Sequence, residues 1–94
     1  MSSTKTAFSQ VDIKRLYWHS RRGMLELDLL LIPFVEHSLT GLSEDELLMY
    51  SDLLREEDQD LFLWLMRRAE APSPRLQLII DKILYANTQA GGSP

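Results

Sequence analysis

The sequence contains no cysteine, and only four glycines and four prolines occur among its 94 residues. The absence of cysteine excludes a disulfide scaffold, a thiolate metal site and a thiol nucleophile. Two of the glycines and one of the prolines fall in the last four residues, so the interior has few residues that break a helix. Because a chain of this length makes one small domain, we expect a single hydrophobic core.

The chain also lacks a long apolar run and an excess of positive charge. The longest apolar run, residues 29–35, contains a proline and is far shorter than the roughly 20 residues that cross a bilayer. The first ten residues resemble neither a signal peptide nor a transit peptide, so we expect a bacterial cytoplasmic protein without membrane insertion. The net charge of −4 argues against nucleic acid as a partner, since phosphate binding needs clustered cations.

The apolar residues recur at helical spacing, and no segment alternates for long with the period of a strand. We therefore predict an all-α fold, a compact five-helix bundle over residues 10–87, with a flexible segment at 1–9 and a disordered tail at 88–94. A kink or break is expected at Pro33, inside the second helix. With their N-caps, the expected helices cover residues 9–20, 23–38, 43–55, 58–71 and 73–87. The expected N-caps of the first, third, fourth and fifth are Ser9, Ser43, Asp58 and Ser73.

Catalytic constellations are scarce in this sequence. The two histidines, His19 and His37, are 18 residues apart and do not have the spacing of a metal site. The chain has no glycine-rich phosphate loop and no nucleophile elbow. Since no nucleophile, base and orienting group occur together, we expect a protein that is not itself an enzyme.

The most informative segment lies at the junction of the first two expected helices. Arg22 and Glu26 are four residues apart, which would make them neighbours on one helix face that continues to Leu29. One interpretation is a surface ion pair worth roughly 0–1 kcal/mol, with Gly23 as a helix junction. The other is a binding face, because Gly23 would let the backbone of a partner approach charged side chains closely.

The pattern Arg22-Gly23-x-x-Glu26 resembles the signature of the SdhE family of flavinylation factors, whose mitochondrial relatives are called succinate dehydrogenase assembly factor 2. Residues 21–37 are similar to the second helix of that family, including its Asp, Pro-Phe and His positions. Residues 58–66, DQDLFLWLM, are similar to its Asp-Leu-Phe-x-Trp-Leu segment. The resemblance covers about residues 10–87 and implies a five-helix bundle.

The resemblance implies an accessory, chaperone-like protein that assists covalent attachment of FAD to a histidine of a partner. The implied partners are the flavoprotein subunit of succinate dehydrogenase and, in bacteria, that of fumarate reductase. The assistance would consist of orientation, because the flavin itself supplies the chemistry. The sequence has no dinucleotide fingerprint, so we expect no tightly bound cofactor on this chain and FAD carried by the partner.

Seven residues are the expected partner-binding set. Gly23 is the position of close approach, and Arg22 and Glu26 form a charged rim. Asp28 either contacts the partner or balances Arg21, whereas Trp64 and Phe62 are expected in the core. The full set is Arg21, Arg22, Gly23, Glu26, Asp28, Leu29 and His37. Two other functions stay open: an antitoxin-like protein that binds a small membrane protein, as described for members of this family, and a generic helical adaptor.

Overall fold

The computed structural model describes residues 10–90, and this part of the chain contains helices and no strand. This confirms the all-α class and the five α-helices of the prediction. The elements are α1 (Gln10–His19), α2 (Leu25–Ser38), the short 3₁₀ helix η2 (Leu39–Gly41), α3 (Glu44–Leu53), α4 (Asp58–Leu65) and α5 (Pro74–Ala90). The proposed cap at Ser9 and the predicted flexible segment at 1–9 lie outside the described residues, as do residues 91–94.

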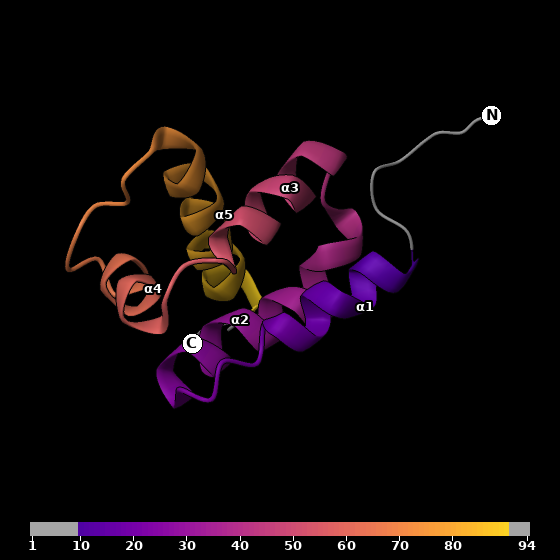
Figure 1. Cartoon of the computed structure of the whole chain (residues 1–94), viewed down its shortest axis with the longest axis horizontal. Helices are drawn as coiled ribbons and strands as arrows, with labels where there is room; N and C mark the ends of the chain where they lie inside the picture. The colour runs from indigo at the N-terminus through magenta and orange to yellow at the C-terminus, as the bar shows by residue number, and fades with distance from the viewer. Residues whose placement is uncertain (1–9, 91–94) are drawn as a thin grey trace.

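Helix α5 is the centre of the bundle and packs against α2, α3 and α4, while α1 packs along α2 (Figure 1). Apolar stripes on α2 and α5 contribute to this core. Their fully or almost fully buried members are Leu27, Leu31, Phe34, Val35, Leu76, Ile79, Ile80 and Ile83. Trp64 is also buried, as expected. None of the described helices is long and apolar enough to span a membrane.

Two of the predicted helix starts are confirmed at atomic detail. The backbone N–H of Glu46 donates to Ser43 Oγ at 3.1 Å, and the Ser43 N–H donates to Glu46 Oε1 at 2.9 Å. This reciprocal pair, together with Lys82 at 3.0 Å, lowers the pKa of Glu46. At the start of α5 the Leu76 N–H donates to Ser73 Oγ, with Pro74 as the first helical residue.

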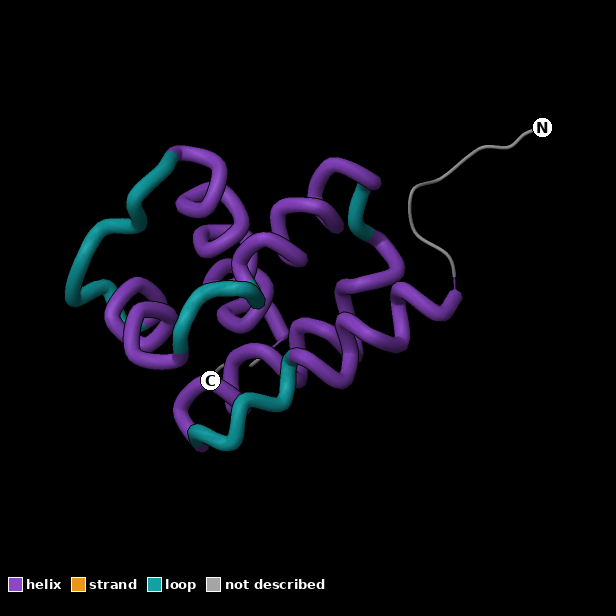
Figure 2. Tube along the Cα trace, viewed as in Figure 1, coloured by secondary structure: helices purple, strands orange, loops and turns teal. Residues whose placement is uncertain are grey.

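The prediction for the fourth helix was wrong at both ends. Glu57, not Asp58, is the N-cap, and Asp58 is the first helical residue. The helix ends at Leu65 rather than before Pro72, because Arg67 adopts a left-handed conformation with φ 59°. The Arg67 and Arg68 N–H groups then donate to the carbonyls of Trp64 and Leu63, which is a Schellman motif. A long loop follows and leads to α5 (Figure 2).

Two further expectations concern the ends and the continuity of helices. Of the kink or break expected at Pro33, the break is wrong, because α2 continues through this residue and has buried residues on both sides of it. Asn87 of α5 donates its side-chain amide to the Leu30 carbonyl at 2.9 Å, which ties this part of α2 to α5. Helix α5 extends to Ala90, past the boundary at 88 that we predicted, and Thr88 Oγ1 donates to the Leu84 carbonyl.

A buried polar contact links the residue that follows α1 to α3. Ser20 and Tyr50 are almost completely buried, and their hydroxyl groups form a hydrogen bond. Since Ser20 Oγ already donates to the Leu16 carbonyl at 2.8 Å, the Tyr50 hydroxyl is the donor in this pair. Burial raises the pKa of Tyr50 above its usual value, because the charged phenolate would lose its hydration.

The Tyr50 shift predicts a loss of stability in alkali. An unfolded tyrosine ionises near pH 10, whereas the folded Tyr50 stays neutral to higher pH, so the free energy of unfolding should fall above pH about 10. Urea unfolding at neutral pH and above pH 10 measures this. The variant Tyr50→Phe should lose less stability over the same interval, and an equal loss in both proteins would contradict the assignment.

Candidate partner-binding site

The Arg22–Glu26 segment does not form one continuous helix face. Helix α1 ends at His19 and α2 begins at Leu25, so Arg22 and Gly23 lie in the connection between them. The expected i, i+4 pairing of Arg22 with Glu26 on a helix is therefore wrong. Its physical reason is the conformation of Gly23, whose φ of +85° belongs to the left-handed region and cannot continue a right-handed helix. We call residues 21–24 the motif loop.

Arg22 is held by its own protein rather than presented to solvent. Its side chain is 15% exposed, and Nε donates to Asp58 Oδ1 at the start of α4 at 2.8 Å. The two terminal nitrogens donate to three backbone carbonyls: those of His19 at 3.1 Å, Leu54 at 2.9 Å and Glu56 at 2.8 Å. Arg22 therefore joins the end of α1 to the turn between α3 and α4, and it is not the charged rim that we predicted.

Asp28 fixes the backbone of Arg22. Its Oδ1 accepts the Arg22 N–H at 2.9 Å, from a position in the first turn of α2. The sequence left open whether Asp28 contacts a partner or balances Arg21, and neither alternative included this bond. The Arg22 side chain and main chain are thus both anchored, and the motif loop is bonded to α1, α2, α4 and the turn before α4.

Several residues around these two anchors are exposed. Apart from its two chain neighbours, a Cβ built on Gly23 meets no atom within 4 Å, so this glycine faces open space. Arg21 and Glu26 are exposed, and Leu29 is 63% exposed. Leu25, which the sequence reasoning missed, is 68% exposed one turn before Leu29. The structure thus brings an open glycine, an acid and two apolar side chains together at the start of α2.

His37 does not join this group. It is exposed near the last turn of α2, twelve residues after Leu25. At about 1.5 Å per residue, this places it roughly 18 Å along the helix from Leu25. A partner that contacts both His37 and the motif loop would therefore have to cover the whole length of α2.

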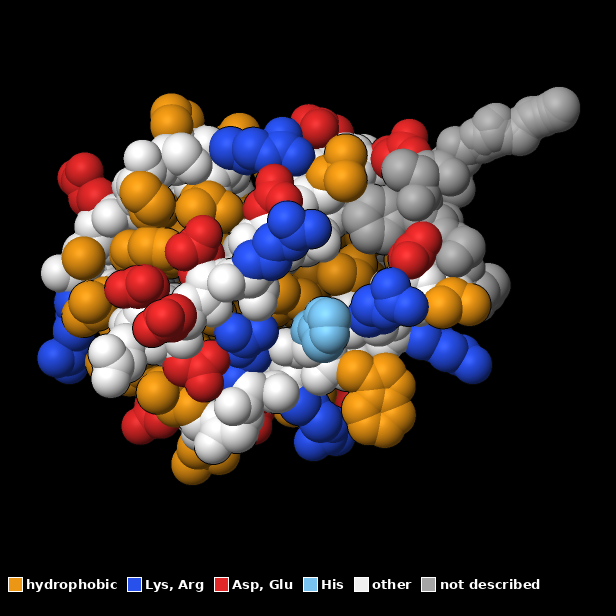
Figure 3. Space-filling view, in the orientation of Figure 1, with side chains coloured by type: hydrophobic (Ala, Val, Ile, Leu, Met, Phe, Trp, Pro, Cys, Tyr) orange, Lys and Arg blue, Asp and Glu red, His pale blue; other side chains and the backbone are white. Residues whose placement is uncertain are grey.

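A groove with five basic and two acidic lining residues adjoins the motif loop. A cavity of about 630 Å³ lies between α1 and the end of α3, and Trp18 at its edge is 72% exposed. Its basic lining residues are Arg15, His19, Arg21, Arg22 and Arg55. Acidic side chains gather over the region of α4, and Lys and Arg side chains follow α1 (Figure 3). Trp18 is not among the residues predicted from the sequence.

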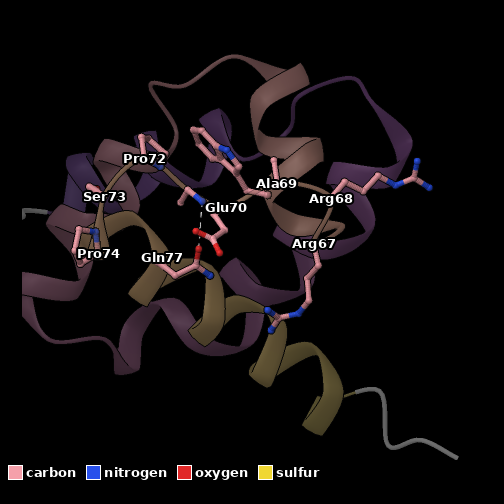
Figure 4. Close-up of a pocket in the computed structure, with 10 residues that line it drawn as sticks. Arg67, Arg68, Ala69, Glu70, Pro72, Ser73, Pro74 and Gln77 are labelled. Carbon is pink, nitrogen blue, oxygen red and sulfur yellow. Dashed lines mark hydrogen bonds between the residues drawn. The ribbon is translucent and has the colours of Figure 1, made fainter.

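A second cavity, of about 700 Å³, lies at the long loop between α4 and α5 (Figure 4). Figure 4 marks one hydrogen bond between its lining residues, from the Ala71 N–H to Gln77 Oε1 at 3.3 Å. The Arg68 side chain points away from the cavity. None of the seven predicted residues lines it. In the described part of the chain, no group of three or more His, Asp or Glu residues could hold a metal ion.

The described part of the molecule is thus a small helical bundle that presents a rigidly anchored, exposed glycine loop. This arrangement is typical of a binding protein rather than of a catalytic centre. Residues 14–87 match the family described as "Flavinator of succinate dehydrogenase". The chain is 49% identical over 75 residues to the FAD assembly factor SdhE of Pseudomonas putida, which covers 80% of this chain and 89% of that protein.

Other relatives agree with this match. The FAD assembly factor SdhE of Pseudomonas savastanoi pv. phaseolicola is 51% identical over 74 residues, covering 79% of this chain and 88% of the relative. The protein of the same name from Photobacterium profundum is 41% identical over 73 residues, covering 78% and 83%. The chain therefore belongs to the SdhE family of FAD assembly factors, which are accessory proteins for flavinylation.

Proposed function

We propose that this protein binds the flavoprotein subunit of succinate dehydrogenase in the bacterial cytoplasm and promotes covalent attachment of FAD to it. The flavoprotein subunit of fumarate reductase is the second partner in this proposal. The observation that carries the proposal is the exposed Gly23, held in a left-handed conformation between the anchored Arg22 and the start of α2. Membership of the family, shown over residues 14–87, supports the nature of the reaction.

The described surface offers binding groups rather than reactive ones. The motif loop carries no nucleophile, and the apolar side chains of Leu25 and Leu29 would be desolvated when a partner covers them. Glu26 gives the partner an exposed charged acceptor beside Gly23. We infer that the contribution to flavinylation is to bind the immature subunit and orient it, which lowers the entropic part of the barrier.

FAD itself would be held by the partner in this proposal. A pyrophosphate favours a helix N-terminus that follows a glycine-rich turn. Here the helix after Gly23 carries Glu26 and Asp28 in its first turn, and these carboxylates would repel phosphate oxygens. The residues at this helix start therefore do not fit the phosphates of FAD, and no step of the proposed function is assigned to FAD bound on this chain.

The test of the proposed function is covalent flavin on the succinate dehydrogenase flavoprotein subunit produced with and without this protein. The sample is denatured and separated on a gel, and flavin fluorescence is read in the band of the subunit. We expect a fluorescent band that depends on this protein. A band of equal intensity without it would refute the proposal.

The exposed acid beside Gly23 gives a prediction about affinity. Glu26→Ala should weaken binding to the flavoprotein subunit by about tenfold, because an exposed acceptor that pairs across an interface contributes roughly 1–2 kcal/mol. Glu44→Ala, which changes an acid in the first turn of α3, should weaken it less. A titration with both variants measures this, and equal affinities would show that Glu26 is not part of the binding surface.

A further inference from the structure

Asp58 lies 36 positions from Arg22 in the chain, yet its carboxylate meets the Arg22 guanidinium at 2.8 Å. We propose that Asp58 is a positioning residue of the partner-binding site, which holds the motif loop in its binding conformation through Arg22. The proposal rests on the proposed function and adds to it a residue outside the motif.

The geometry shows why a carboxylate at this position matters. The guanidinium has five N–H donors, and the structure gives it four bonds, of which three reach neutral carbonyl oxygens. Asp58 supplies the only negative partner among these four. Because the Arg22 side chain is only 15% exposed, the charge that Asp58 balances is largely shielded from water.

Asp58 does not cap α4, although its position in the sequence predicts that it would. An acid that precedes a helix usually caps it through its side chain, but the N-cap of α4 is Glu57 and Asp58 lies within the helix. The carboxylate is instead used across the bundle, between α4 and the connection that precedes α2.

The anchoring of Arg22 also determines how mobile Gly23 is. Gly23 is the residue after Arg22 and has no side chain of its own to pack, so its conformation depends on its neighbours. The Arg22 main chain is held by Asp28 and its side chain by Asp58. Without the Asp58 carboxylate, the Arg22 side chain loses its negatively charged partner. We therefore expect the backbone at Gly23 to become more mobile. A mobile loop must be ordered when the partner binds, which weakens binding.

The experiment compares Asp58→Asn with Asp60→Asn in the full chain. Asp60 is an exposed acid in the same first turn of α4. Its variant therefore measures the effect of losing a negative charge at the start of α4 without losing the bond to Arg22. Two quantities are measured: affinity for the succinate dehydrogenase flavoprotein subunit, and NMR backbone order parameters of the free protein well below its melting temperature. Asp58→Glu is the conservative variant, which keeps the carboxylate.

We expect Asp58→Asn to bind about tenfold more weakly, since one charge-assisted bond is lost, and to lower the order parameters at residues 22–24 toward about 0.6. The order parameters of α5 should not change, Asp60→Asn should behave as the unchanged protein, and Asp58→Glu should recover part of the affinity.

Two results would overturn the proposal. One is an Asp58→Asn variant that binds and orders its loop like Asp60→Asn. The other is an Asp58→Asn variant that only melts earlier while residues 22–24 stay as ordered as before, since Asp58 would then stabilise the bundle without positioning the loop. If the unchanged protein fails to bind the subunit, the proposed function fails instead, and the order parameters alone decide whether Asp58 holds the loop.

Discussion

Gly23→Arg should abolish covalent flavinylation of the partner subunit while the helical bundle stays folded. Two effects combine at this position. A residue with a side chain at φ +85° costs about 1–2 kcal/mol, which is smaller than the stability of roughly 5–15 kcal/mol of a typical domain. The arginine side chain would then project into the open space in front of Gly23, where the partner is proposed to approach.

Two control variants separate strain from obstruction. Gly23→Ala introduces the strain but little bulk, so it should keep part of the activity. Gly41→Arg places the same large side chain on another exposed glycine that has no positive φ, and it should flavinylate normally. Flavin fluorescence of the denatured subunit and a circular dichroism melt are measured on all three. An unfolded Gly23→Arg protein would mean that the glycine is only structural.

Arg22→Ala should lower the free energy of unfolding by about 2–3 kcal/mol, whereas Arg21→Ala should change it by less than about 0.5 kcal/mol. The two arginines are adjacent in sequence but differ in environment. Arg22 bonds to Asp58 and to three backbone carbonyls, while Arg21 is exposed. The expected loss of unfolding free energy is smaller than for a fully buried ion pair, because Asp58 is 35% exposed and water reaches part of its carboxylate.

Denaturant unfolding followed by circular dichroism measures both arginine variants. Arg22→Lys serves as a further comparison, because lysine keeps the charge but cannot reproduce the forked geometry of the guanidinium. It should be destabilised by an amount between those of the unchanged protein and Arg22→Ala. Equal stability of Arg21→Ala and Arg22→Ala would contradict the structural role of Arg22.

The helices could be predicted from the sequence because their apolar stripes and caps are local features. Ile79, Ile80 and Ile83 repeat at helical spacing and are buried. The capping box of Ser43 and Glu46 needs only three residues of separation. The end of α4 could not be predicted in this way, because it depends on Arg67 adopting a conformation that is usual for glycine and uncommon for arginine.

Only part of the geometry of the candidate site could be predicted from the sequence, and the reason is physical. That Gly23 is exposed and needs a special conformation follows from its residue type and position. The role of Arg22 depends on Asp58, 36 residues away, and on carbonyl groups that only the folded chain brings together. Helical spacing therefore suggested Glu26 as the partner of Arg22, whereas the bundle provides Asp58.

The measurement that tests the account most directly is hydrogen–deuterium exchange of the full chain with and without the succinate dehydrogenase flavoprotein subunit. We predict slower exchange in the presence of the subunit for peptides that span residues 21–29, where the motif loop meets α2. Peptides from the α4–α5 loop, residues 66–73, should exchange equally in both samples. Protection confined to the α4–α5 loop, with residues 21–29 unchanged, would contradict the account.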